Sequence, residues 1–139
     1  MRLVTRNQYS RVMTENIDGM HDMGFNIVVP ANTPTTLHET FTVPAGYVAI
    51  LRNATGNVQA TAGMGQANAL LRMTRPGQPM LEVFQVSSNA GTPSEAKVIS
   101  SVYNIIMPEG TLVATFYSNF DGTAPRNVRL YLVIDLIRL

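Results

Sequence analysis

Two Pro-x-Gly phrases constrain the fold of this chain more than any other feature. Pro44-Ala45-Gly46 separates the β-type runs 36–43 and 47–54. Pro108-Glu109-Gly110 repeats the phrase later in the chain, and the same number of residues separates the two prolines and the two glycines. Proline removes a ladder donor and fixes φ, and glycine accepts positive φ, so each phrase turns the chain between two strands. Two equivalent corners predict two equivalent halves of a β-domain. The alternative is a common strand-entry turn that recurs by coincidence.

Short β-type runs divided by turn clusters fill the chain from residue 25 onward. The run 127–139 gives the clearest strand signal, because large aliphatic residues occupy every second place: Val128, Leu130, Leu132, Ile134 and Leu136. Its other face carries Tyr131, Val133 and Ile137 and is half apolar as well. A loop, the N-terminal segment or another subunit is therefore expected to cover that second face.

The number and spacing of these runs predict an all-β protein. About eight strands, with no helix signal after residue 24, favour an antiparallel β-sandwich that is jelly-roll-like. An immunoglobulin-like sandwich is the second candidate, although the chain has neither cysteine nor tryptophan. The length of 139 residues suits one domain, which we expect at residues 25–139.

Residues 1–24 differ from the rest of the chain and are interpreted as an N-terminal arm. They are polar and rich in methionine, and the spacing of their apolar residues predicts one face of a short helix. Three placements are open for this arm: against its own domain, loose, or docked on a neighbour. The candidate contact residues are apolar anchors with arginines that suit forked ion pairs: Arg2, Arg6, Tyr9, Arg11, Val12, Met13, Ile17, Met20 and Met23.

The charge content argues against several classes of partner. Only 14% of the residues are charged, where about 25% is usual, so part of the surface is expected to be covered. The net charge is +1 without a basic block, and no nucleic-acid partner is expected. No apolar run reaches the roughly 18 residues that a membrane span needs, so no membrane partner is expected either.

No residue pattern predicts a reaction or a cofactor. Pro108-Glu109-Gly110 resembles the corresponding phrase of metal-binding cupins, but Val113 stands where a cupin has histidine. His21 and His38 are the only histidines, so neither a metal site nor a cofactor is expected. A hydrolytic pair of carboxylates would need distant acids to converge, and the candidates are Glu39, Glu82, Glu109 and Asp135. We expect a protein that is not an enzyme.

Two further expectations concern single side chains. Glu39 falls on the apolar side of its run, which places its carboxylate at an edge of the sheet. Tyr117 and Phe120 flank a loop, where aromatic rings could stack on sugars; core packing is the alternative reading of both.

The phrase Phe-Thr-Val-Pro-Ala-Gly-Tyr-Val-Ala-Ile-Leu-Arg, residues 41–52, resembles small β-sandwich structural proteins of tailed-bacteriophage virions. Capsid cement or decoration proteins are the closest type. The resemblance implies a jelly-roll body on the virion surface, assembled in the host cytoplasm. It also implies a trimer whose arms bridge neighbouring subunits, with the major capsid protein and further copies of the chain as partners. The alternative is a carbohydrate- or receptor-binding module of a phage tail or fibre.

Overall fold

The computed structural model describes residues 17–59, 65–88 and 96–139, and these form eight β-strands. The strands are β1 (Ile17–Val29), β2 (Thr33–Thr42), β3 (Tyr47–Gln59), β4 (Ala67–Thr74), β5 (Leu81–Ser88), β6 (Ala96–Met107), β7 (Leu112–Asn119) and β8 (Arg126–Arg138). Within these ranges no helix is long and apolar enough to cross a membrane.

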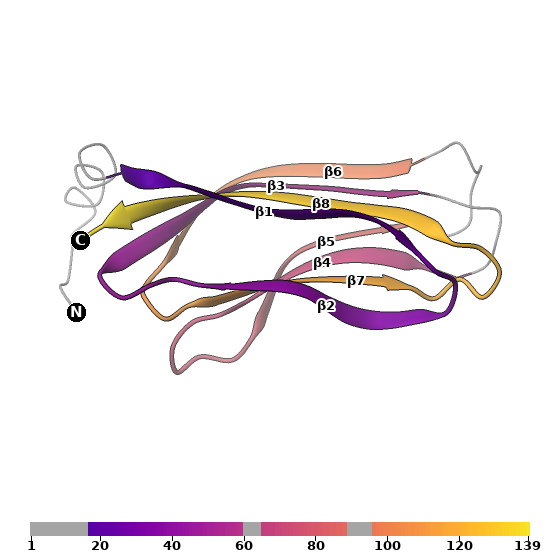
Figure 1. The fold of residues 1–139 in the computed structure, drawn as a ribbon, viewed down its shortest axis with the longest axis horizontal. Helices are drawn as coiled ribbons and strands as arrows, with labels where there is room; N and C mark the ends of the chain where they lie inside the picture. Colours follow the sequence, from indigo (N-terminus) through magenta and orange to yellow (C-terminus); the bar gives the residue numbers. More distant parts are fainter. Residues whose placement is uncertain (1–16, 60–64, 89–95) are drawn as a thin grey trace.

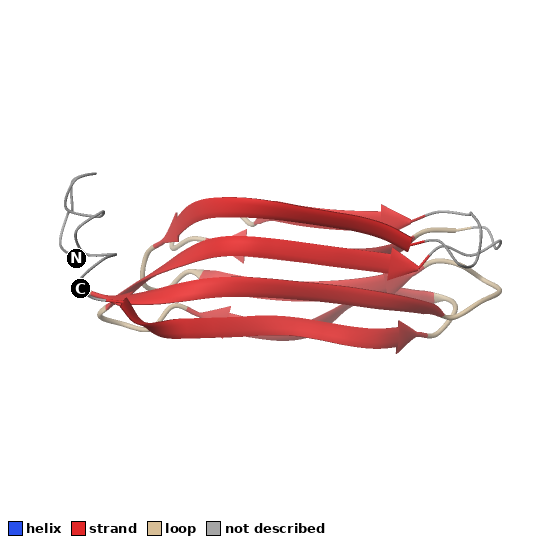
Figure 2. Cartoon of the chain, turned by 90° about the horizontal axis from the view of Figure 1, so that it is seen from above, coloured by secondary structure: helices blue, strands red, loops and turns tan. Residues whose placement is uncertain are grey.

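The strands form two four-stranded antiparallel sheets that pack face to face (Figures 1 and 2). One sheet has the order β1-β8-β3-β6 and the other the order β2-β7-β4-β5. The first and last strands are neighbours, and the chain crosses between the sheets at every connection except β4–β5, as in a jelly roll. The predicted all-β, jelly-roll-like sandwich is confirmed, and the order differs from the ABED and CFG sheets of an immunoglobulin domain.

The two Pro-x-Gly corners have the same geometry and lie against each other. Gly46 and Gly110 both have φ of 82°. In each corner the residue after the glycine donates to the proline carbonyl: Tyr47 N to Pro44 O and Thr111 N to Pro108 O, both 3.2 Å. Gly110 N also donates to Val43 O at 2.9 Å, and Gly46 N donates to Glu109 Oε2 at 2.9 Å. One corner joins β2 to β3 and the other β6 to β7, so the predicted equivalence of the corners is confirmed.

Strand β1 corrects the boundary that the sequence predicted for the arm. It begins at Ile17 and pairs with β8 as far as Val29, so residues 17–24 belong to the sheet and continue no helix. Met23, expected among the arm contacts, is buried in the core between the sheets. The reason is that β8 has a free backbone edge, and a ladder along it overrides weak local β-propensity.

Gly56 of β3 lies directly opposite the side chains of Phe84 and Val86 on β5 of the other sheet. It lies buried on β3, and a Cβ added to it would stand 2.9 Å from Phe84 Cε1 and closer still to Val86. We expect Gly56→Ala to lower the free energy of unfolding by about 1–3 kcal/mol, because the extra methyl group overpacks the core. Urea denaturation measures this loss. Gly122→Ala is the control, since its Cβ would meet Asn32 Oδ1 at 3.4 Å; an equal loss there would contradict the explanation.

Candidate binding surfaces

A buried ion pair occupies the end of the sandwich away from the two corners. The side chains of Arg126 and Asp121 have no exposed surface, and Arg126 Nη2 lies 3.0 Å from Asp121 Oδ2. The same guanidinium donates to Ser88 O at 2.6 Å and to Gly65 O at 3.0 Å. The pair therefore joins the β7–β8 connection to the ends of the β3–β4 and β5–β6 connections.

The carboxylate of Asp121 also organises its own loop. Oδ1 accepts hydrogen bonds from Thr123 N at 2.8 Å and from Thr123 Oγ1 at 2.7 Å. The backbone carbonyl of Asp121 accepts a hydrogen bond from Asn32 N at 2.9 Å, so the β1–β2 connection is also attached to this loop. All four connections at this end meet at one closed polar centre. Its role is structural, because no surface of the pair is open to a ligand.

Sequence reasoning missed this centre, and the signal for it was weak. An acid and an arginine five residues apart in a Gly- and Pro-containing loop look like solvated charges. Only the alternation of β8 hinted otherwise: Arg126 has the same parity as the core residues Val128 and Leu130, which predicts an inward side chain.

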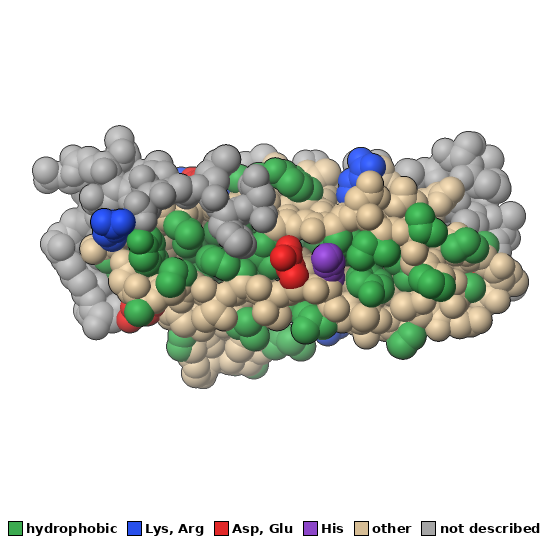
Figure 3. Space-filling model, viewed as in Figure 1, with side chains coloured by type: hydrophobic (Ala, Val, Ile, Leu, Met, Phe, Trp, Pro, Cys, Tyr) green, Lys and Arg blue, Asp and Glu red, His purple; other side chains and the backbone are tan. Residues whose placement is uncertain are grey.

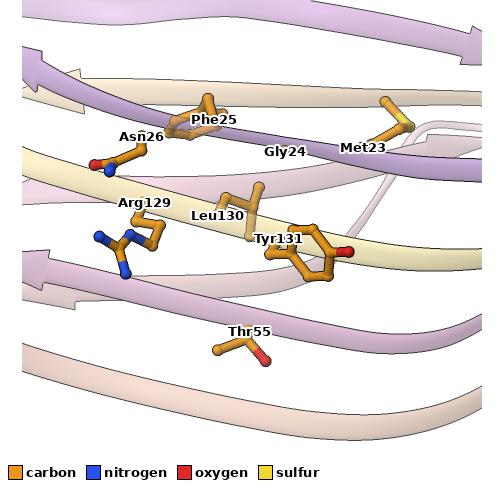
Figure 4. Close-up of a pocket in the computed structure, with 8 residues that line it drawn as sticks. All are labelled: Met23, Gly24, Phe25, Asn26, Thr55, Arg129, Leu130 and Tyr131. Carbon is orange, nitrogen blue, oxygen red and sulfur yellow. The ribbon is translucent and has the colours of Figure 1, made fainter.

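A shallow groove of about 580 Å³ lies on the outer face of the sheet, over β1, β8 and β3. Tyr131 stands at its centre, paired across β8 with Gly24 on one side and Thr55 on the other. Arg129 follows two residues away on the same face, paired with Asn26 of β1 (Figure 4). We call these five residues the outer-face groove.

Gly24 allows the ring of Tyr131 to lie close to the sheet. A Cβ at Gly24 would stand 3.3 Å from Tyr131 Cδ2 and 2.6 Å from Leu130 O, so only glycine fits there without displacing the backbone. The ring packs over the glycine, an arrangement that covers a residue without a side chain on a strand. Tyr131 nevertheless remains 47% exposed.

The side of the sandwich between β1 and β2 carries a cluster of aromatic rings. His38 stacks on Phe25 with ring centroids 5.0 Å apart, and Tyr117 meets Phe25 edge-on at 5.8 Å. Glu39 Oε1 accepts a hydrogen bond from Gly24 N at 3.1 Å. The prediction that the carboxylate of Glu39 sits at a sheet edge is thus confirmed, since it occupies a donor on the free side of β1.

Apolar side chains continue along this side, as Figure 3 shows for the face on which β1 and β2 lie. Ile27 and Phe41 are half-buried against the core. Val28 of β1 and Leu37 of β2 are exposed large aliphatic residues on the two edge strands. We call this side, from β1 to β2, the apolar seam.

The predicted interface residues of the last strand have three different environments. Tyr131 is exposed in the outer-face groove, and Val133 is half-buried. Ile137 is buried on the outer face in a small cluster with Val48 and Ile50. Ile137 is therefore not open to a partner, whereas Tyr131 is.

The remaining candidates from the arm and the aromatic pair differ in what the structure describes of them. Arg2, Arg6, Tyr9, Arg11, Val12 and Met13 lie outside the described residues. Ile17 and Met20 fall within β1, where their backbones pair with Ile137 and Asp135; their side chains are not described. Tyr117 belongs to the apolar seam, whereas Phe120 is exposed in the β7–β8 connection, so they form no shared stacking platform.

The four candidate carboxylates also lie apart. Glu39 and Glu82 are on β2 and β5, the opposite edges of one sheet. Glu109 is in the second corner, and Asp135 on β8 of the other sheet pairs with Arg52 at 2.7 Å. Among the described residues no group of three or more His, Asp or Glu could hold a metal ion.

Comparison with known proteins gives distant structural likenesses only. No family model and no curated protein matches the chain. The globular domain of zebrafish complement 1qA is 18% identical with a TM-score of 0.48, over 90% of this chain and 100% of that one. VP2 in the subviral particle of infectious bursal disease virus is 7% identical with a TM-score of 0.40, over 88% of this chain and 38% of that one. TmCBM61, solved in complex with β-1,4-galactotriose, is 16% identical with a TM-score of 0.36, over the full length of both chains. With TM-scores below 0.5, these likenesses assign neither family nor function.

Proposed function

We propose that this chain is a structural subunit of a virion, of the capsid cement or decoration type, and that copies of it associate through the apolar seam. The observation that carries the proposal is the seam itself: half-buried core residues open to one side, bordered by the exposed Val28 and Leu37. An apolar surface continuous with the core is expected to be covered in the working assembly. The low charge content of 14% points the same way.

The edge of β1 favours contact through side chains over the addition of a further strand. Free strand edges invite pairing with other chains, and proteins block them with charged groups. Glu39 supplies such a block, because its carboxylate accepts the hydrogen bond of Gly24 N. A neighbouring copy would therefore pack on Ile27, Phe41 and the rings around Phe25 rather than extend the sheet.

The resemblance of residues 41–52 to phage virion proteins supports the finer part of the proposal. It implies that the assembled chain attaches to the major capsid protein and that the form that attaches is a trimer. In a trimer, modest contacts act together through their effective concentration, so a weak single site can still hold firmly.

Leu37→Asp tests the seam. A charge at this residue, 51% exposed, should leave the fold intact and weaken self-association by tenfold or more, which corresponds to about 1.4 kcal/mol or above. Light scattering coupled to size-exclusion chromatography over a concentration series measures the change. The matched control is Met80→Asp, which introduces the same charge at a residue 56% exposed and next to β5, the opposite edge strand. A parent protein that stays monomeric at every concentration, or equal weakening by both variants, would contradict the proposal.

A further inference from the structure

The outer-face groove combines an exposed aromatic ring with hydrogen-bonding groups of neighbouring strands. The ring of Tyr131 packs over Gly24, so its support is the backbone of β1. Thr55 and Asn26 lie beside it on β3 and β1, and Arg129 lies next along β8 (Figure 4). An apolar ring with a few convergent polar groups is the usual composition of a small-molecule site, and the groove has a suitable volume of about 580 Å³.

The charge of the groove favours an anionic ligand. Arg129 is exposed, and no carboxylate of a described residue lies within salt-bridge distance of it. None of the described residues that line the groove is acidic. Arg52, which also lies on this face, is already paired with Asp135 at 2.7 Å. An arginine with its fork unengaged is well suited to bind a carboxylate in bidentate fashion.

We propose that the outer-face groove binds an acidic sugar residue of a glycan. The C–H face of the pyranose ring stacks on Tyr131, and the sugar carboxylate pairs with Arg129. Asn26 and Thr55 supply hydrogen bonds to ring hydroxyls. The polar groups stand beside the aromatic ring rather than around a closed apolar pocket, which suits a ligand that is apolar on one face and polar at its rim. This site is separate from the apolar seam, so it does not depend on the proposed assembly.

One open binding site of this kind gives weak affinity by itself, because little of the ligand is enclosed. Several copies of the chain in one assembly would raise the avidity for a polymeric glycan without any new contact. The monovalent site is therefore tested with small probes at high concentration.

The test compares methyl glucuronide with methyl glucoside, which differ in the carboxylate, by two-dimensional NMR titration of the full chain. We expect the glucuronide to shift the amide signals of Tyr131, Arg129 and Gly24 in a saturable manner at millimolar concentrations, and the glucoside to bind more weakly. Tyr131→Ala should weaken glucuronide binding about tenfold, whereas Tyr131→Phe keeps the stacking face and should bind as the parent does. Arg129→Gln should abolish the preference for the glucuronide.

The control variant is Phe120→Ala, which removes an exposed aromatic ring from a distant connection and should leave both titrations unchanged. Equal binding of the two sugars by the parent would overturn the acidic specificity. Absence of any saturable shift in the groove, or unchanged binding by Tyr131→Ala with a native spectrum, would overturn the site.

Discussion

Replacing Asp121 by asparagine should lower the free energy of unfolding by about 3–5 kcal/mol, because it leaves the buried guanidinium of Arg126 without a compensating charge. Neither side chain has exposed surface, so water cannot take over the role of the lost carboxylate. The loss should appear in urea denaturation as a lower midpoint at unchanged slope.

Two further variants separate the buried charge from the loss of a salt bridge in general. Asp135→Asn breaks the Arg52 pair, whose side chains are 27% and 13% exposed, and should cost about 1 kcal/mol or less. Adding Arg126→Met to Asp121→Asn removes the uncompensated charge and should restore part of the stability. Equal losses for Asp121→Asn and Asp135→Asn would mean that burial of the pair is not what makes it important.

The parts of this fold that were predictable from the sequence are those set by short-range chemistry. Proline and glycine determine the backbone at Pro44 and Gly46 wherever the strands go, so the corners could be predicted with their turn geometry. Alternation along β8 identified its core face because the period of a strand does not depend on its partners. Glu39 could be placed at an edge because a carboxylate on an apolar face must reach a donor or water.

The parts that were missed depend on which strands become neighbours. Gly24, Thr55 and Tyr131 come from three distant parts of the chain, and only the order β1-β8-β3 creates the groove between them. The same holds for Arg126, which meets Ser88 and Gly65 only after four connections gather at one end. The intrinsic propensity of a residue for strand or turn does not determine which strands and connections become its neighbours.

The start of β1 was missed for a related reason, and it determines how the N-terminal segment should be tested. Residues 17–24 include two glycines and few β-branched residues, so their sequence alone does not indicate a strand. They form one because their backbone hydrogen-bonds to β8. Residues 1–16 and 17–24 are thus expected to differ in what their removal costs.

Deleting residues 1–24 should prevent stable folding, whereas deleting residues 1–16 should leave all eight strands in place. The longer deletion removes more than half of β1, opens the edge of β8, and takes Met23 out of the core. The loss of a buried methionine side chain alone costs about 2–5 kcal/mol, a large part of the stability of a single domain. Thermal unfolding followed by circular dichroism compares the two variants with the parent.

Under the proposed function, the shorter deletion should also weaken attachment to the virion, because residues 1–16 then act as the arm. A folded 1–24 deletion with an unchanged melting temperature would show that β1 is dispensable; an unfolded 1–16 deletion would show that this segment belongs to the domain and is not an arm.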